Sequence, residues 1–427
     1  MTRLRHRIAL GSIVAASALT LVLFFANPAL QRDPKRPAQL PALAQWIAEH
    51  PADWLAASAI TDQSLDSPLA LQRRVALWHS SYALARYLAP LRPNPTAGFV
   101  RAGLFHWYEL GPADRKAVLD AATPMLQDPL TFEAMHRPLW ELTRDLAYLR
   151  RVAPRTIPTF TMLRDLAVAS GDFAKYRELR EDLREARMAE FHAKRATATI
   201  GALIAILPPT LTTDDEPLVR AILQEIERRP FDVESMGGRL EDFTLYAIRH
   251  GLQPLSALSS LVEINGKLTP STRARLAIAL GDRAAAMRIE LITGVTNTPE
   301  WIPYHLERAA FEEKNNDPAL AALYRTRATV PDAPPENVWT GPCSVNELCT
   351  SLHRTHSGPL TFQVSVTQSD EIPPYVEVYL DDALVAEGEV HDQRTFTINA
   401  SPEKHRTEVR LVNRFTKNGT QRRARLS

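Results

Sequence analysis

The N-terminal stretch Ile8–Leu30 constrains this chain more than any other part of the sequence. It carries no charge, and three arginines stand just before it. A bilayer core of about 30 Å requires about 20 apolar residues in a helix, and Ile8–Ala26 approaches that length. Basic residues in front of such a segment stay in the cytoplasm. We therefore expect residues 1–30 to be a signal anchor and the chain after Arg32 to be exported.

A cleaved signal peptide is the alternative interpretation of this segment. Its apolar core would be about 7–15 residues long and would end in small residues. The run here is longer, and Phe24–Ala29 makes a poor cleavage site, so the pattern favours an anchor. Both interpretations export the chain. Residues 31–39, charged and proline-bearing, would then form a tether. We expect a single-pass protein of a bacterial inner membrane, with the bulk of the chain in the periplasm.

The cysteine content fits an exported protein. Cys343 and Cys349 are the only two cysteines, and a close pair in an oxidising compartment predicts a disulfide. A zinc site is the alternative, because His353 and His356 lie nearby and could complete four ligands. The spacing between the cysteines departs from the usual zinc-finger pattern, which favours the disulfide.

Residues 40–330 are predicted to form a helical body. Glycine is scarce, at 16 of 427 residues, and Ala and Leu are frequent, which favours helices. Apolar residues recur with helical spacing, as in Leu43, Trp46 and Ile47. Further helices are expected in these places: Leu69–Leu91, from Pro112 onward, Pro129–Arg151, Ile157–Ser170 and Ile200–Leu207. Strings of helices with short connections pack as bundles or α-solenoids.

A long, heavily charged helix is predicted at Phe173–Arg195. Its apolar residues share one stripe: Phe173, Tyr176, Leu179 and Leu183. Glu181 is expected to pair with Arg177 and Arg184, which lie at helical spacing from it. The polar face could bind a partner or face solvent, and the pattern favours a solvated outer face.

Three turns in the body share one pattern, in which Gly or Asn is followed by Asp: Gly171-Asp172, Gly281-Asp282 and Asn316-Asp317. Each is expected to end one helix and to begin the next with Asp as the N-cap. Asp282 and Asp317 are 35 positions apart, close to the tetratricopeptide period of about 34 residues. Residues 271–327 therefore resemble tetratricopeptide repeats. The resemblance implies an α-solenoid with a concave surface for partners.

The hydrophobic period changes to that of strands after a proline-rich linker at 331–338. Six short strands are predicted within 339–427, which indicates an antiparallel β-sandwich. In one of them Val376 and Val378 alternate with Tyr375, Glu377 and Tyr379. The dipeptide Asp381-Asp382 reads as a hairpin turn. Asn418-Gly419 predicts a second hairpin, between strands at 407–411 and 421–426.

The segments Tyr375–Gly388 and His405–Asn413 resemble the small calcium-dependent carbohydrate-binding sandwiches of xylan-binding type. The resemblance implies that a calcium ion holds a pair of sugar hydroxyls in a loop, although Arg414 replaces the acidic residue that such modules carry there. Calcium prefers several oxygen ligands. The calcium candidates are Asp370, Glu371, Asp381 and Asp382, of which the last two are explained more simply as turn residues.

Aromatic residues of the same region offer a second way to hold a sugar. Trp339, Tyr375 and Tyr379 could each stack on a sugar ring, because an aromatic face combines apolar area with a polar handle. Tyrosines on an outward strand face are also simply good strand formers. The sequence leaves both interpretations open.

The familiar catalytic motifs are missing from the sequence, including G-x-S-x-G, H-E-x-x-H and the phosphate loop. Net charge is only +1, which gives no reason to expect a nucleic-acid partner. We therefore expect a non-catalytic, membrane-tethered envelope adaptor that binds protein partners or a polysaccharide. The alternative is a glycan-processing enzyme with a helical groove, as in lytic transglycosylases and α/α-toroid lyases, because paired carboxylates can lie anywhere in a sequence.

Overall fold

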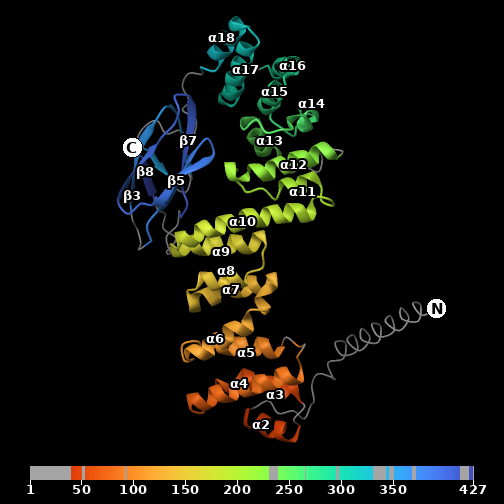
Figure 1. Cartoon of the computed structure of the whole chain (residues 1–427), viewed down its shortest axis with the longest axis vertical. Helices are drawn as coiled ribbons and strands as arrows, with labels where there is room; N and C mark the ends of the chain where they lie inside the picture. Colours follow the sequence, from red (N-terminus) through yellow and green to blue (C-terminus); the bar gives the residue numbers. More distant parts are fainter. Residues whose placement is uncertain are drawn as a thin grey trace, which may run out of the picture. The chain divides into compact units, whose positions relative to one another are not determined.

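The computed structural model describes these residues: 40–50, 53–90, 92, 94–229, 239–264, 266–294, 298–329, 343–345, 351–367, 372–413 and 423–426. The chain divides into two compact units, Met1–Pro154 and Arg155–Ser427. The described part of the chain is mostly helical, with an antiparallel β-sheet region at its C-terminal end. Figure 1 gives the order of the elements along the chain.

Unit 1 is built from helices. They are α2 Leu40–Glu49, α3 Trp54–Ser64, α4 Leu71–Leu88, α5 Asn94–Phe105, α6 Pro112–Ala122, η2 Met125–Gln127, α7 Pro129–Thr143 and α8 Leu146–Val152. Trp78 of α4 lies at the centre, fully buried. Its ring stacks on Phe99 of α5 with a centroid distance of 4.0 Å, and Tyr82 stacks on the same phenyl ring. Aromatic packing therefore joins α4 to α5.

The described residues of unit 2 begin with thirteen helical segments. They are α9 Ile157–Ser170, α10 Phe173–Lys194, α11 Ile200–Ile204, η3 Thr213–Asp215, α12 Glu216–Arg228, α13 Leu240–Arg249, η5 Leu255–Leu258, α14 Ser260–Glu263, α15 Pro270–Ala279, α16 Arg283–Thr293, η6 Pro299–Trp301, α17 Ile302–Lys314 and α18 Pro318–Arg327. One continuous apolar core runs through them from Phe191 to Tyr324.

The three predicted Asp-capped turns are confirmed. Gly171, Gly281 and Asn316 all adopt positive φ. In each turn the following Asp accepts a hydrogen bond from a backbone N–H three residues later. Glycine suits the first position because it adopts positive φ without steric cost. These turns separate α9 from α10, α15 from α16, and α17 from α18.

The prediction of one helix over Pro129–Arg151 is wrong. Arg144 adopts a left-handed conformation that ends α7. Asp145 then caps α8, because its carboxylate accepts a hydrogen bond from the backbone N–H of Tyr148. The break therefore comes from a local capping interaction that overrides the continuous helical period.

The β region contains eight strands in the described residues: β1 Cys343–Val345, β2 Ser351–Ser357, β3 Leu360–Thr367, β4 Tyr375–Leu380, β5 Ala383–Glu389, β6 Gln393–Ile398, β7 Lys404–Leu411 and β8 Arg423–Leu426. They form two antiparallel sheets with strand orders β1-β8-β3-β6 and β2-β7-β4-β5. Residues of both sheets, among them Phe362 and Val376, form one apolar core.

The predicted hairpin between β7 and β8 is wrong. β8 pairs with β1 and β3, whereas β7 pairs with β2 and β4 in the other sheet. β7 and β8 therefore belong to different sheets and do not pair as a hairpin. Strand β2 was not predicted, since its sequence is rich in histidine and arginine.

Several expectations fall on residues that lie outside the described ranges. They are the anchor 1–30, the tether 31–39, the linker 331–338, Trp339, Cys349, Asp370 and Glu371, and the Asn418-Gly419 turn. Among the helices that are described, none has the length and apolar character needed to cross a bilayer. Cys343 is placed only as part of the β1 backbone, so the disulfide stays a prediction.

Candidate functional site

The outer face of sheet β2-β7-β4-β5 packs against the long helix α10. Phe173 and Tyr176 point from the helix to the sheet, and the ring of Phe173 stacks on Tyr375 of β4 at a centroid distance of 4.3 Å. Tyr176 meets the same ring edge-on. All four residues of the predicted stripe are buried: Phe173, Tyr176, Leu179 and Leu183. On the polar face of this helix Arg180 contacts the β region, whereas Arg177, Glu181 and Arg184 are exposed, as the expectation of a solvated outer face implies.

Glu377 of β4 is the centre of this contact and is only 4% exposed. Its Oε1 accepts hydrogen bonds from the hydroxyl of Tyr176 at 2.7 Å and from Arg180 at 3.0 Å. Its Oε2 accepts a bond from the hydroxyl of Tyr379 at 2.8 Å. Arg180 also reaches Glu387 of β5 at 3.1 Å. A buried carboxylate is stable only when it is paired and hydrogen-bonded, and Glu377 meets both conditions.

These contacts keep the phenols neutral and the guanidinium charged. Burial raises the pKa of Tyr176, and the carboxylate of Glu377 raises it further. The same two causes raise the pKa of Tyr379. Burial by itself would lower the pKa of Arg180, but Glu387 and Glu377 outweigh it and raise that pKa. At neutral pH each of these groups therefore stays in the form that its hydrogen bonds require.

A second contact is made by the β4–β5 turn. Both Asp381 and Asp382 adopt positive φ, as two-residue hairpin turns of type I′ require. Oδ2 of Asp382 lies 2.6 Å from Arg249 of α13 and 3.1 Å from His250. The backbone oxygen of Asp382 accepts a hydrogen bond from the N–H of Thr213 in η3. One turn residue thus joins the β region to two helical segments.

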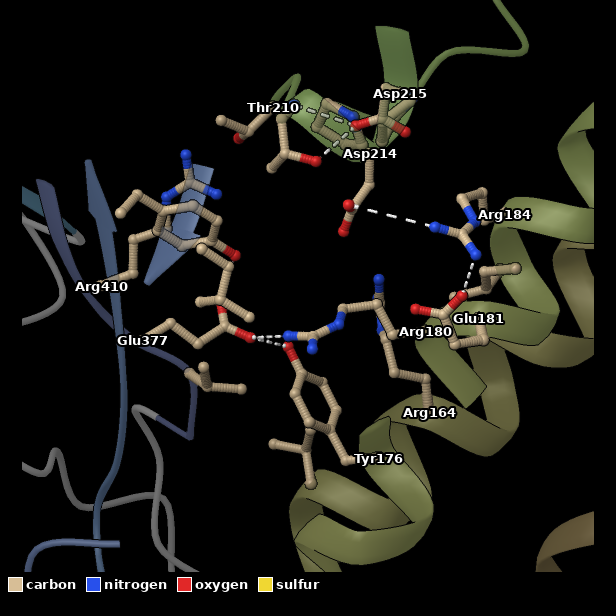
Figure 2. A pocket seen from close by; sticks show the side chains of 18 of the residues that line it. Arg164, Tyr176, Arg180, Glu181, Arg184, Thr210, Asp214, Asp215, Glu377 and Arg410 are labelled. Carbon is tan, nitrogen blue, oxygen red and sulfur yellow. Dashed lines mark hydrogen bonds and ion pairs between the residues drawn. The ribbon is translucent and has the colours of Figure 1, made fainter. Parts of the chain in front are cut away.

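A cleft of about 470 Å³ opens between α9, α10, η3 and the same sheet face. This size lies in the usual range of ligand sites, about 300–1,000 Å³. In Figure 2, Tyr176 and Arg180 reach across to Glu377, and Arg184 lies between Glu181 and Asp214. The cleft is therefore walled by helix on one side and by the sheet on the other.

Most charges in the cleft are already paired. Arg184 contacts Glu181 and lies 4.0 Å from Asp214 at the rim, and all three side chains are about half exposed. On the floor, Arg410 donates to Glu408 at 2.6 Å, and its guanidinium lies over the ring of Tyr379. Burial opposes the charge of both partners, but their mutual hydrogen bonds outweigh it. The pKa of Glu408 is lowered and that of Arg410 is raised.

Arg187 differs from the other arginines of the cleft. The described part of the chain gives it no hydrogen bond and no ion pair. Burial lowers the pKa of Arg187, Asp215 opposes this, and Arg164 and Arg239 lower it further. The carboxylate of Asp215 is itself engaged, because it accepts hydrogen bonds from the backbone N–H and the hydroxyl of Thr212.

The structure places the sugar-stacking candidates in two different situations. Tyr375 and Tyr379 are 2% and 4% exposed, and Phe173 covers one face of the Tyr375 ring. A ring that is buried in this way has no face to offer a sugar. Tyr379 nevertheless lines the cleft floor. Trp339, the third candidate, lies outside the described ranges.

The turn aspartates do not fit a calcium site. Asp382 is held by Arg249 and His250, and Asp381 lies 2.6 Å from a ring nitrogen of His405. These carboxylates face cations and hydrogen-bond donors instead of the further oxygen ligands that calcium needs. Within the described ranges no group of three or more metal-ligating side chains occurs. Asp370 and Glu371 are not described.

The two histidines of the alternative zinc site do not point to a common position. His353 and His356 both lie on β2, three positions apart, and therefore point to opposite faces of the strand. His353 lies beside Arg406, and His356 contacts the hydroxyl of Thr407. Burial and Arg406 lower the pKa of His353, so this ring is neutral at neutral pH.

Apart from Tyr379, the residues that line the cleft were not predicted as a site. Glu377 and Glu408 lie in strands, and Arg180 and Arg187 lie in a helix about 200 positions earlier in the chain. The available signal was the unusual charge of the long helix together with acidic residues inside otherwise apolar strands. No known protein family, curated protein or solved structure matches this chain.

Proposed function

We propose that this protein is a non-catalytic binding protein that holds a glycan in the cleft between α9, α10 and the sheet. The observation that carries this proposal is the pairing of charges along the cleft wall. Guanidinium groups only donate hydrogen bonds and carboxylates only accept them, whereas a hydroxyl does both. A wall of fixed Arg–carboxylate pairs therefore complements a ligand rich in hydroxyl groups.

The balance of charge supports a polyhydroxylated ligand over a highly charged one. Five arginines and six acidic residues line the cleft, so it exerts little long-range attraction on either sign of charge. Arg184, Glu181 and Asp214 at the rim are about half exposed and can exchange bonds with water for bonds with sugar hydroxyls. The buried pairs on the floor hold their geometry without a ligand, which reduces the entropic cost of binding.

We further propose that the protein works as a membrane-tethered adaptor of the bacterial envelope, in polysaccharide or cell-envelope assembly. The arginine-flanked apolar segment 1–30 supports export of the remaining chain. The paired helices α15–α18, which resemble tetratricopeptide repeats, would add a surface for protein partners. The two-sheet β region would act as a carbohydrate-binding sandwich whose outer face contributes to the cleft.

Glycan binding can be tested by affinity electrophoresis of the detergent-solubilised full chain in gels that contain neutral or acidic polysaccharides. We expect retardation by at least one polysaccharide, with or without a calcium chelator. The double variant Arg184→Ala, Asp214→Ala should lose about tenfold in affinity. Lys194→Ala, an exposed change at the end of the same helix, serves as the control and should bind as the wild type does.

Two results would overturn this proposal. One is the absence of retardation by every polysaccharide for a chain that is folded by circular dichroism. The other is the release of shortened sugars during incubation, with loss of that activity on substitution of a cleft carboxylate, which would favour the glycan-processing enzyme.

The placement can be tested separately in intact cells. We expect a C-terminal tag to be accessible from the periplasm, and Cys343 and Cys349 to resist alkylation until a reductant is added. A tag that is accessible only from the cytosol, together with free thiols, would contradict the proposed placement without bearing on glycan binding.

A further inference from the structure

We propose that the glycan carries an anionic group, a carboxylate or a phosphate, and that Arg187 receives this group where the cleft adjoins a smaller pocket. This inference rests on the proposed glycan-binding function and names the class of glycan. It follows from a contrast within the cleft. Arg180, Arg184 and Arg410 each have a carboxylate partner, whereas Arg187 has no such partner among the residues described.

The surroundings of Arg187 explain why the missing partner matters. A smaller, mainly apolar pocket of about 240 Å³ adjoins the cleft, and Met188, Pro217 and Leu218 line it together with Arg187. The aliphatic stem of Arg187 can lie along this apolar surface while its guanidinium reaches the polar cleft. Asp215 acts on Arg187 electrostatically but forms no ion pair with it among the described residues. The cost of withdrawing this cation from water is therefore only partly offset, and an incoming anion would relieve the remainder.

Charges of both signs surround Arg187: Arg164 and Arg239 favour an anion here, whereas Glu185, Asp214 and Asp215 line the adjoining pocket and oppose it. Arg164 also lines the cleft, and it is paired with the adjacent Asp165. Arg239 lies close enough to oppose the charge of Arg187, and its own guanidinium donates to the backbone oxygens of Leu207 and Pro208. A guanidinium presents several N–H donors in one plane, which suits the oxygens of carboxylate or phosphate.

The test compares glycans that differ only in charge. Binding of the full chain to an oligosaccharide with one galacturonate residue is measured beside its methyl ester, and binding to a singly phosphorylated mannan oligosaccharide is measured beside its dephosphorylated form. We expect at least one acidic member to bind ten-fold or more tightly than its neutral partner. Whichever pair shows the difference identifies carboxylate or phosphate as the recognised group.

Substitution of Arg187 assigns the effect to this residue. Arg187→Gln should remove the preference for the acidic glycan and should change the affinity for the neutral glycan by no more than about twofold. Arg187→Lys should restore part of that preference. Arg195→Gln, at the exposed C-terminal end of α10, is the matched control. Thermal unfolding checks that each variant folds.

The outcomes separate this inference from the function on which it rests. If acidic and neutral glycans bind equally and Arg187→Gln changes neither, the anionic group is refuted and the glycan cleft stands. If neither acidic nor neutral glycans bind, both the anionic-group inference and the proposed glycan-binding function are refuted. A preference that survives Arg187→Gln but is lost on substitution of another arginine would also refute the role given to Arg187.

Discussion

The hydroxyl of Tyr176 on α10 lies 2.7 Å from Oε1 of Glu377 on β4, although 201 positions separate the two residues in the chain. The same carboxylate accepts bonds from Arg180 and Tyr379. A single buried acid thus fixes the helix to the sheet and positions the residues of the cleft floor.

Glu377→Gln should lower the free energy of unfolding by about 2–3 kcal/mol, because it leaves Arg180 half-paired and sets an amide N–H₂ against hydroxyl donors. Urea unfolding of the full chain measures this change. The matched control is Glu387→Gln, which removes only one contact of Arg180 and should cost less than about 1 kcal/mol. Equal effects of the two substitutions would show that Glu377 is not the centre of the contact.

Asp382→Asn should cost about 2 kcal/mol, because the 6%-exposed carboxylate loses its charge-assisted bonds to Arg249 and His250. Asn tolerates positive φ nearly as well as Asp, so the turn itself is preserved. The neighbouring substitution Asp381→Asn keeps the same turn and changes a side chain that is 47% exposed. We expect it to cost under about 1 kcal/mol, and a larger loss than for Asp382→Asn would contradict this assignment.

The stability of unit 2 should depend on pH through Asp382. Burial would raise the pKa of this carboxyl, but the hydrogen bond from His250 and the charges of Arg249 and Arg406 outweigh it, so the folded-state pKa lies below the ordinary value. The folded protein therefore binds fewer protons than the unfolded chain in this range. The contribution is complete above the ordinary pKa of 3.8 and disappears as pH falls through the folded-state value.

The measurement is the urea midpoint at pH 6 and at about pH 3, for the wild type and for Asp382→Asn. The difference in stability between the two proteins should shrink at the lower pH. A difference that is the same at both pH values would mean that the ionised carboxylate does not contribute.

Gly171→Ala should destabilise the chain more than Gly281→Ala. Both glycines have positive φ, so both substitutions incur about 1 kcal/mol of backbone strain. A Cβ at position 171 would also lie 2.9 Å from Cγ2 of Ile372, whereas nothing lies within 4 Å of a Cβ at position 281. We expect the extra cost at position 171 to be about 1 kcal/mol. Thermal unfolding of both variants checks this, and equal losses would contradict the close approach of Ile372.

The sequence predicted those features that are decided by nearby residues. The turns at Asp172, Asp282 and Asp317 each depend on one left-handed residue and one capping carboxylate, and both signals lie within a few positions. The alternation of Val376 and Val378 with Tyr375 and Glu377 likewise follows from the pleat of a single strand. The break between α7 and α8 also has a local signal, the capping residue Asp145, but the continuous helical period of the sequence conceals it.

The features that were not predicted depend on distant partners. The Asn-Gly signal describes a turn but does not say which sheet the next strand joins, and β8 joins the sheet opposite β7. Tyr375 and Tyr379 read as outward-facing because nothing near them in the sequence shows that α10 covers their side of the sheet. The cleft arises only when α10 and β4 meet, and no local pattern encodes that meeting.

The floor of the cleft and the joint between α10 and the sheet are made by one row of side chains, since Tyr379 and Glu377 take part in both. Occupancy and assembly are consequently linked in the thermodynamic sense. A molecule that binds the cleft only while α10 and the sheet are in contact must stabilise that contact. A change that separates α10 from the sheet in part of the population must in turn weaken binding in proportion to the fraction of molecules that keep the contact.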